Sequence, residues 1–204
     1  MFNKKIIAIA VLGFSVLTVA NSHAAPYVGG QLGYGNVHQF TGIDNGKDTG
    51  IAGRLFAGYQ FNDYFATEMG WSKFSNATTS LAFSDTDFNG YVKGTVKTDA
   101  VDLVVKGILP VTAQMNVYGK LGGAYVVSRG NINVSYVDSG YSYSGSYSET
   151  ERKLLPTAGV GASYAINNNL AADISYNRIQ KVGNNSSFVN STDLVSLGLI
   201  YSIG

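Results

Sequence analysis

The amino-acid sequence predicts an all-β protein, an eight-stranded antiparallel up-and-down transmembrane β-barrel that follows an N-terminal signal peptide. Three observations lead to this prediction. Segments of about ten residues alternate apolar and polar side chains, which is typical of strands with two different faces. Short and long polar connections separate these segments in turn. Beyond the first 24 residues, no segment is long and apolar enough for a transmembrane helix, so a membrane crossing must use strands.

The first 24 residues have the pattern of a secretory signal peptide. Lys4 and Lys5 precede an apolar stretch over residues 6–20, and Ser22-His23-Ala24 supplies small residues where a signal peptidase cleaves. An anchoring helix is the alternative, but it would need about 17 to 25 apolar residues, and this stretch is shorter. We therefore predict cleavage before Ala25 and a barrel domain over residues 25–204.

The predicted mature chain is close to neutral and contains no cysteine. Without Lys4 and Lys5, 12 of the 14 basic residues remain against 13 acidic residues, so no basic excess exists to attract nucleic acid. The absence of cysteine excludes a disulfide-stapled domain, a thiolate metal site and a cysteine nucleophile. A soluble secreted enzyme usually carries more charge than the 13% found here.

Four strands are expected in the first half of the domain. Tyr27–Asn36 alternates apolar side chains with Gly and Gln, and Ile51–Phe61 alternates Leu, Ala, Tyr and Phe with Arg, Phe, Gly and Gln. Asn62-Asp63 forms a two-residue turn into Tyr64–Phe74. After a long loop, Asp99–Leu109 alternates Val and Leu with Asp, Val and Lys.

Four more strands are expected in the second half. A turn over residues 110–114 leads into Met115–Arg129, and another long loop precedes Leu154–Ile166. Three consecutive asparagines, which tolerate left-handed backbone, turn the chain into Leu170–Arg178. The last strand, Asp193–Ile203, alternates Val, Leu, Tyr and Ile with Ser and Gly.

We expect the apolar face of these strands to point outward, because eight strands leave a lumen that side chains fill. Short turns belong on the periplasmic side and long loops outside the cell. Aromatic residues are expected to form girdles at the two interfaces: Tyr27, Tyr59, Phe61, Phe65, Tyr164 and Tyr201 near the turns, and Trp71, Tyr125 and Tyr176 near the loops. A soluble lipocalin-like barrel or a β-sandwich is the alternative, and the loop asymmetry disfavours it.

Several stretches resemble the OmpA-type transmembrane β-barrel family of outer-membrane proteins. They are residues 57–62 leading into 68–71, residues 117–123 and residues 194–201. The resemblance covers essentially the whole predicted mature chain. It implies a location in the cell outer membrane, with lipid, lipopolysaccharide and the outer-membrane insertion machinery as partners. Larger family members continue into a peptidoglycan-binding domain, whereas this sequence stops at Gly204, so wall anchoring is not expected.

Charged residues at inward positions predict a charge network in the lumen. They are Arg54, Glu68, Asp102, Lys106, Lys120 and Asp173. Lys106 and Lys120 flank one turn, and Glu68 and Asp173 are expected to compensate their charge. The resemblance implies that Glu68, Lys106 and Lys120 match a salt-bridge plug of the family, whereas Ser163 and Asp173 depart from its pattern. We expect a closed but rewired plug, with a narrow, switchable ion path as the alternative.

A second set of cations lies at outward positions near the loop ends. These loop-end cations are Lys73, Lys97, Arg129, Arg152 and Arg178. They are either solvated surface residues or contacts for lipopolysaccharide phosphates, for which Lys and Arg are suited. The third loop, Ser135–Ser148, is a run of Ser, Tyr and Gly that resembles binding loops in composition, although polar surface loops reach this composition without a partner.

Catalysis is not expected. The predicted mature chain has one histidine, His38, with Asp44 and Asp48 in the same loop, and no serine or acid stands at strand spacing beside it. Glycine-rich stretches fall inside strands and do not form phosphate-binding loops. Neither a cofactor nor a metal ion is expected.

The sequence therefore predicts a small, monomeric outer-membrane barrel with a structural role in envelope integrity, a plugged lumen and surface-displayed loops. Two other functions remain open at this point. One is a low-conductance, porin-like channel, and the other is a surface adhesin or immune-evasion factor whose loops bind a host ligand.

Overall fold

The computed structural model describes residues 24–37, 49–84, 88–138, 141–182 and 191–203. The predicted signal peptide lies almost wholly outside these residues, as do His38, Asp44 and Asp48. The described residues form nine strands: β1 Ala25–Val37, β2 Thr49–Asn62, β3 Phe65–Lys73, β4 Ala77–Ser84, β5 Phe88–Pro110, β6 Met115–Asp138, β7 Tyr141–Ala165, β8 Leu170–Ile179 and β9 Thr192–Ser202.

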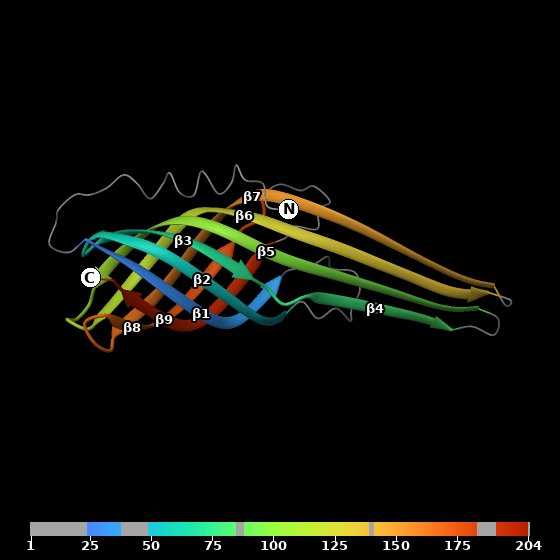
Figure 1. Cartoon of the computed structure of the whole chain (residues 1–204), viewed down its shortest axis with the longest axis horizontal. Helices are drawn as coiled ribbons and strands as arrows, with labels where there is room; N and C mark the ends of the chain where they lie inside the picture. The colour runs from blue at the N-terminus through green and yellow to red at the C-terminus, as the bar shows by residue number, and fades with distance from the viewer. Residues whose placement is uncertain (1–23, 38–48, 85–87, 139–140, 183–190, 204) are drawn as a thin grey trace.

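Eight of these strands close into a ring, as the sequence predicts. Each is antiparallel to its neighbours in the order β3-β2-β1-β9-β8-β7-β6-β5, and β5 pairs with β3 to complete the circle (Figure 1). The ring satisfies the backbone hydrogen bonds that an open sheet edge would leave unpaired. Among the described residues, no helix is long and apolar enough to cross a membrane.

Short turns at one end of the ring, the turn end, are held by side chains that cap backbone N–H groups. Asn62 Oδ1 accepts hydrogen bonds from the backbone N–H groups of Tyr64 and Phe65 at 2.8 and 2.9 Å. Asn167 Oδ1 accepts from Asn169 and Leu170 at 3.0 and 2.9 Å. The turn between β2 and β3 lies one residue later than expected, because Asn62 ends β2 and serves as the acceptor.

The prediction of long loops over residues 75–98 and 130–153 is wrong for most of their length. Residues 88–98, 130–138 and 141–153 continue β5, β6 and β7 beyond the ring, and β4 pairs with the β5 extension. This projecting sheet, formed by β4 and these extensions, reaches far past the barrel at the end opposite the turns (Figure 1). Its abundant Ser, Gly and Asn favour loops locally, but continuous in-register pairing with neighbouring strands outweighs that preference.

The two faces exchange polarity where the strands leave the ring. Within the ring, β6 carries Leu121 outward, 70% exposed, and buries Lys120 inward. Further along, the inward face carries Ile132, which lies opposite Tyr147, and the outward face carries Asn133 opposite Lys93. An apolar outward band that ends at one level is the arrangement that a lipid bilayer requires.

Candidate functional site: the lumen charge network

All six charged residues predicted for the lumen lie on the inward face of the ring and are buried. The set is Arg54 on β2, Glu68 on β3, Asp102 and Lys106 on β5, Lys120 on β6 and Asp173 on β8. The most exposed of them, Asp102, has 7% of its surface accessible, and Glu68 has 1%. Period-two alternation along each strand is sufficient to place them there.

Glu68 is the centre of the network. Its Oε1 lies 3.2 Å from Lys106 Nζ, and its Oε2 lies 2.6 Å from Lys120 Nζ and 3.4 Å from Arg54 Nη1. The Tyr27 hydroxyl donates a hydrogen bond to Oε1 at 3.0 Å. The charge of one buried carboxylate therefore partly neutralises three buried cations from three other strands, and these contacts fix the positions of their side chains across the lumen.

Asp102 supplies the second carboxylate of the network. Arg54 binds it through two nitrogens, with Nη2 to Oδ1 at 2.7 Å and Nε to Oδ2 at 3.3 Å. This is the bidentate geometry that favours a fixed Arg–carboxylate pair. Arg54 thus bridges Asp102 and Glu68, and it joins the two acids into one connected cluster.

Aromatic rings lie close to the cations of the network. Lys106 Nζ lies 4.0 Å from the centroid of the Tyr118 ring, and Lys120 Nζ lies 4.9 Å from it. The Arg54 guanidinium lies 4.9 Å from the Phe56 ring. These distances are within the range of cation–π attraction.

The prediction that Tyr27 belongs to an outward aromatic girdle is wrong, because Tyr27 has the same strand parity as Gln31 and points inward with 5% exposure.

Asp173 does not compensate the lysines directly, contrary to the expectation from the sequence. Its carboxylate accepts hydrogen bonds from the Tyr118 hydroxyl, at 2.7 Å, and from Gln31 Nε2. Among the described residues, no cation lies within ion-pair distance of Asp173. Tyr118 stands between the two parts of the lumen, with its ring near Lys106 and its hydroxyl on Asp173.

Two glycines make room for the residues that reach Glu68. A Cβ at Gly58 would lie 2.3 Å from Tyr27 Cζ, and a Cβ at Gly70 would lie 2.5 Å from Arg54 Nη2. Both distances are shorter than atoms tolerate. Side chains at these two positions would push Tyr27 and Arg54 away from the network, so the small residues belong to the site as much as the charges do.

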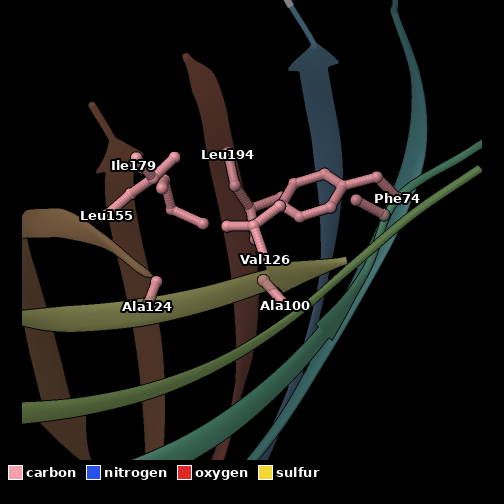
Figure 2. Close-up of a cluster of buried hydrophobic side chains, with 8 residues drawn as sticks. Phe74, Ala100, Ala124, Val126, Leu155, Ile179 and Leu194 are labelled. Atoms are coloured by element: carbon pink, nitrogen blue, oxygen red, sulfur yellow. The ribbon is translucent and has the colours of Figure 1, made fainter. Parts of the chain in front are cut away.

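An apolar cluster lies in the lumen on the side of the network away from the turns. It consists of buried side chains that converge inside the ring: Ala52, Phe74, Ala100, Ala124, Val126, Leu155, Ile179 and Leu194 (Figure 2). A cavity of about 20 Å³ separates it from the charges, with Arg54, Asp102 and Lys120 on one side and Phe74 and Leu194 on the other. A space of this size holds about one water molecule. The lumen therefore contains two successive packed layers of different chemistry.

The five loop-end cations lie on the outward face, as predicted, but two of them have acidic partners that the sequence reasoning missed. Arg129 Nη1 lies 3.4 Å from Asp99 Oδ2, and Arg178 Nη1 lies 3.4 Å from Asp193 Oδ1. The Tyr176 hydroxyl also donates to Asp193 Oδ1, at 2.5 Å. The five residues therefore fall into two groups, two cations with an acidic partner and three without an ion pair among the described residues.

The lumen residues were identified in the sequence by their charge, so the uncharged residues of the lumen were missed. Gln31 and Tyr118 hold Asp173, and the apolar cluster contains no titratable group at all. Strand parity is the one signal that would have found them, because it places Tyr27, Gln31 and Tyr118 inward with the charges. Within the described part of the chain, no group of three or more His, Asp or Glu side chains could hold a metal ion.

Comparisons with known proteins agree with this architecture. A family model described as the OmpA-like transmembrane domain matches residues 21–204. The outer membrane protein A of Serratia marcescens is 31% identical over 218 residues, which cover 97% of this chain and 55% of that protein. An uncharacterized protein of Coxiella burnetii is 29% identical over 220 residues, which cover 88% of this chain and 86% of that protein. The chain spans about half the length of the outer membrane protein A relatives that it matches.

Solved structures show the same fold at low sequence identity. The outer membrane protein OprG of Pseudomonas aeruginosa superposes with a TM-score of 0.53 at 14% identity, over 89% of this chain and 97% of that chain. Neisserial surface protein A superposes with a TM-score of 0.50 at 13% identity, over 89% of this chain and 100% of that chain. At these identities the likeness establishes the outer-membrane β-barrel fold and nothing more specific.

Proposed function

The chain belongs to the OmpA-like transmembrane domain family of the cell outer membrane, and from this premise we propose that it is a closed structural barrel that contributes to envelope integrity. The observation that carries the proposal is the doubly filled lumen. Glu68 and its three cations form one layer, and the apolar cluster forms a second. We assign no catalytic role, because the lumen charges are engaged with one another or with buried hydrogen-bond donors.

Each layer opposes ion passage for a different physical reason. The charge network fills the cross-section with side chains that are tied to at least one partner, so an ion would have to break buried ion pairs to pass. The apolar cluster offers no polar group to replace the hydration shell of an ion, and such constrictions exclude water as well. A conducting state would require both layers to rearrange.

The orientation that we propose places the turn end in the periplasm and the projecting sheet outside the cell. Short periplasmic turns and long extracellular segments are the general arrangement of such barrels. Export through the predicted signal peptide, residues 1–24, would deliver the chain to the periplasm before insertion. We treat the protein as a monomer, because the strands of the ring leave no open edge within the barrel.

Planar-bilayer recordings test the closed lumen against the channel alternative. We expect no reproducible ohmic steps from the wild-type protein, and none from Phe74→Ala, because the charge network remains in place beneath the shortened side chain. Reproducible steps in the wild-type protein that disappear in Lys106→Ala would contradict the closed structural barrel. Heat-modifiable mobility on gels should be checked for each protein first, so that a misfolded variant is not counted as closed.

The projecting sheet favours a second candidate function, surface recognition of a host ligand. Its inward face groups apolar and aromatic side chains, including Ile132, Tyr143 and Tyr147, which are 38%, 56% and 61% exposed. Tyr136 stacks on Tyr143 with a centroid separation of 5.1 Å. Tyrosines on a rigid strand scaffold present contact area at a low cost in conformational entropy.

Shortening the projecting sheet separates this candidate from the structural role. In the variant, Gly130 of β6 is joined to Glu149 of β7 by an Asn-Gly turn, which suits a two-residue hairpin. If the sheet recognises a host ligand, cells that carry the variant should lose adhesion to an immobilised basement-membrane extract while the barrel still inserts. Equal adhesion of wild-type and shortened protein, both at the same level in the outer membrane, would refute the adhesin role.

A further inference from the structure

The level at which the strands leave the apolar band can be read from the register of β3, β5, β6 and β7. On the outward face, Trp71 lies opposite Val101, Val101 opposite Tyr125, and Tyr125 opposite Leu154. These four residues form one apolar row across four neighbouring strands. Trp and Tyr are the residues that collect at the interface between hydrocarbon and headgroups.

The next two outward rows of the same strands are strongly basic. One row further from the turns, Lys73 lies opposite Asp99 and Val127 lies opposite Arg152. One more row out, Lys97 lies opposite Arg129. We call Lys73, Lys97, Arg129 and Arg152 the basic patch. Four cations and one acid, Asp99, give these two rows a net charge of +3.

On the other half of the ring, the charge of the first row beyond the apolar band is balanced. The outward row of Tyr176, Val195, Tyr34 and Ile51 is the apolar row nearest the loops on that half. The next row contains Arg178 opposite Asp193, with Asn36 and Thr49 beside them. Arg178 is neutralised by its ion pair with Asp193 at 3.4 Å. Among the described residues of these rows, the excess of positive charge therefore lies on the side formed by β3, β5, β6 and β7.

The basic patch carries more positive charge than the acidic side chains of the described residues neutralise. Like charges directly opposite on neighbouring strands destabilise a sheet, and Lys97 faces Arg129 in this way. Asp99 reaches Arg129 at 3.4 Å, but the Arg129 side chain stays 50% exposed. Among the described residues, no carboxylate lies within ion-pair distance of Lys73, Lys97 or Arg152.

We propose that the basic patch binds the phosphate groups of lipid A, the membrane anchor of lipopolysaccharide, on one side of the barrel. Successive outward rows are about 7 Å apart along the strands, so Lys73 and Arg152 stand one row beyond the Trp71 and Tyr125 rings, and Lys97 and Arg129 stand two rows beyond them. Glycolipid phosphates meet the acyl region on this side of the aromatic row. Arginine binds phosphate through two parallel N–H groups, and lysine adds a compact charge. This inference rests on the proposed outer-membrane function. Of the five loop-end cations, it assigns phosphate binding to the four of the basic patch and leaves out Arg178.

Trp71 provides a reporter for the binding test, because it is the single tryptophan of the chain and lies two residues from Lys73. The protein is reconstituted in phosphatidylcholine nanodiscs that contain increasing mole fractions of bisphosphorylated lipid A, and Trp71 emission is followed. We expect a saturable change for the wild-type protein. We expect the midpoint to rise roughly tenfold or more in K97Q/R129Q, which loses two charge-assisted contacts.

Two matched variants and a second lipid make the result decisive. R178Q removes a loop-end cation on the balanced half and should keep the wild-type midpoint, and K97R/R129K should restore binding. Lipid A without phosphates should give no saturable change. An unchanged midpoint in K97Q/R129Q, or an equal loss in R178Q, would overturn the proposal. If the wild-type protein fails to insert into phosphatidylcholine at all, the proposed barrel function fails, which is a distinguishable outcome.

Discussion

Replacing Glu68 by glutamine is expected to lower the free energy of unfolding by about 3 to 5 kcal/mol, the range for removing one partner of a buried ion pair. Glu68 contacts Arg54, Lys106 and Lys120, and these three cations would be left with Asp102 as the remaining carboxylate of their cluster. Glutamine preserves the shape of the side chain and an acceptor for Tyr27. The loss would therefore report the missing charge and not a cavity.

Urea unfolding in phosphatidylcholine vesicles measures this effect, with mobility on unboiled gels as the probe. Glu149→Gln is the control, because Glu149 is an exposed acid on the projecting sheet and its neutralisation should change stability by less than about 0.5 kcal/mol. A second variant, Glu68→Gln with Lys120→Met, should recover part of the loss, since it removes one of the uncompensated cations. Equal stability of Glu68→Gln and wild type would show that the network does not hold the lumen together.

An arginine at position 121 is expected to destabilise the inserted barrel by about 2 to 4 kcal/mol, the cost of a cation on the lipid face near the bilayer midplane. Leu121 lies outward on β6, 70% exposed, in the middle of the apolar band. In a soluble barrel the same substitution at an exposed site would change stability by less than about 0.5 kcal/mol. The size of the effect therefore shows whether the outward face of β6 is in contact with lipid or with water.

Ser135→Arg is the matched control for Leu121→Arg. Ser135 is on the same strand and the same face, but it lies in the projecting sheet, where it pairs with Tyr91 and Ser144. We expect Ser135→Arg to unfold at the wild-type urea concentration in the same vesicles. If both arginines had equally small effects, the outward face of the ring would not be in contact with lipid.

Most of the ring could be predicted from the sequence, because its strands obey a strict alternation and end at recognisable turns. The projecting sheet could not. Residues 130–138 and 141–150 are rich in Ser, Asn, Gly and Tyr, and the Ser, Asn and Gly among them favour loops locally. These residues form strands because they pair with strands distant in the sequence, as Lys93 does with Asn133. Single-sequence reasoning does not register that contribution.

In the lumen, strand parity determines which side chains point inward, and packing between strands determines which of them touch. Parity placed all six charges inward, but it could not tell which charges would touch. Asp173 is held by Tyr118 and Gln31 and does not contact a lysine. The apolar cluster around Val126 forms from small, branched and aromatic residues of different strands. These contacts depend on the stagger between strands, which fixes which inward side chains share a level.

Heat-modifiable mobility of the protein in outer-membrane fractions is the most direct test of the central claim, that this chain folds as a membrane-inserted barrel. A closed eight-stranded ring should resist SDS without heating and run at a different position from the boiled, unfolded chain. We predict this shift for the wild-type protein, together with its recovery in the outer-membrane fraction. A mobility unchanged by boiling, with the protein found in the soluble periplasm, would contradict it.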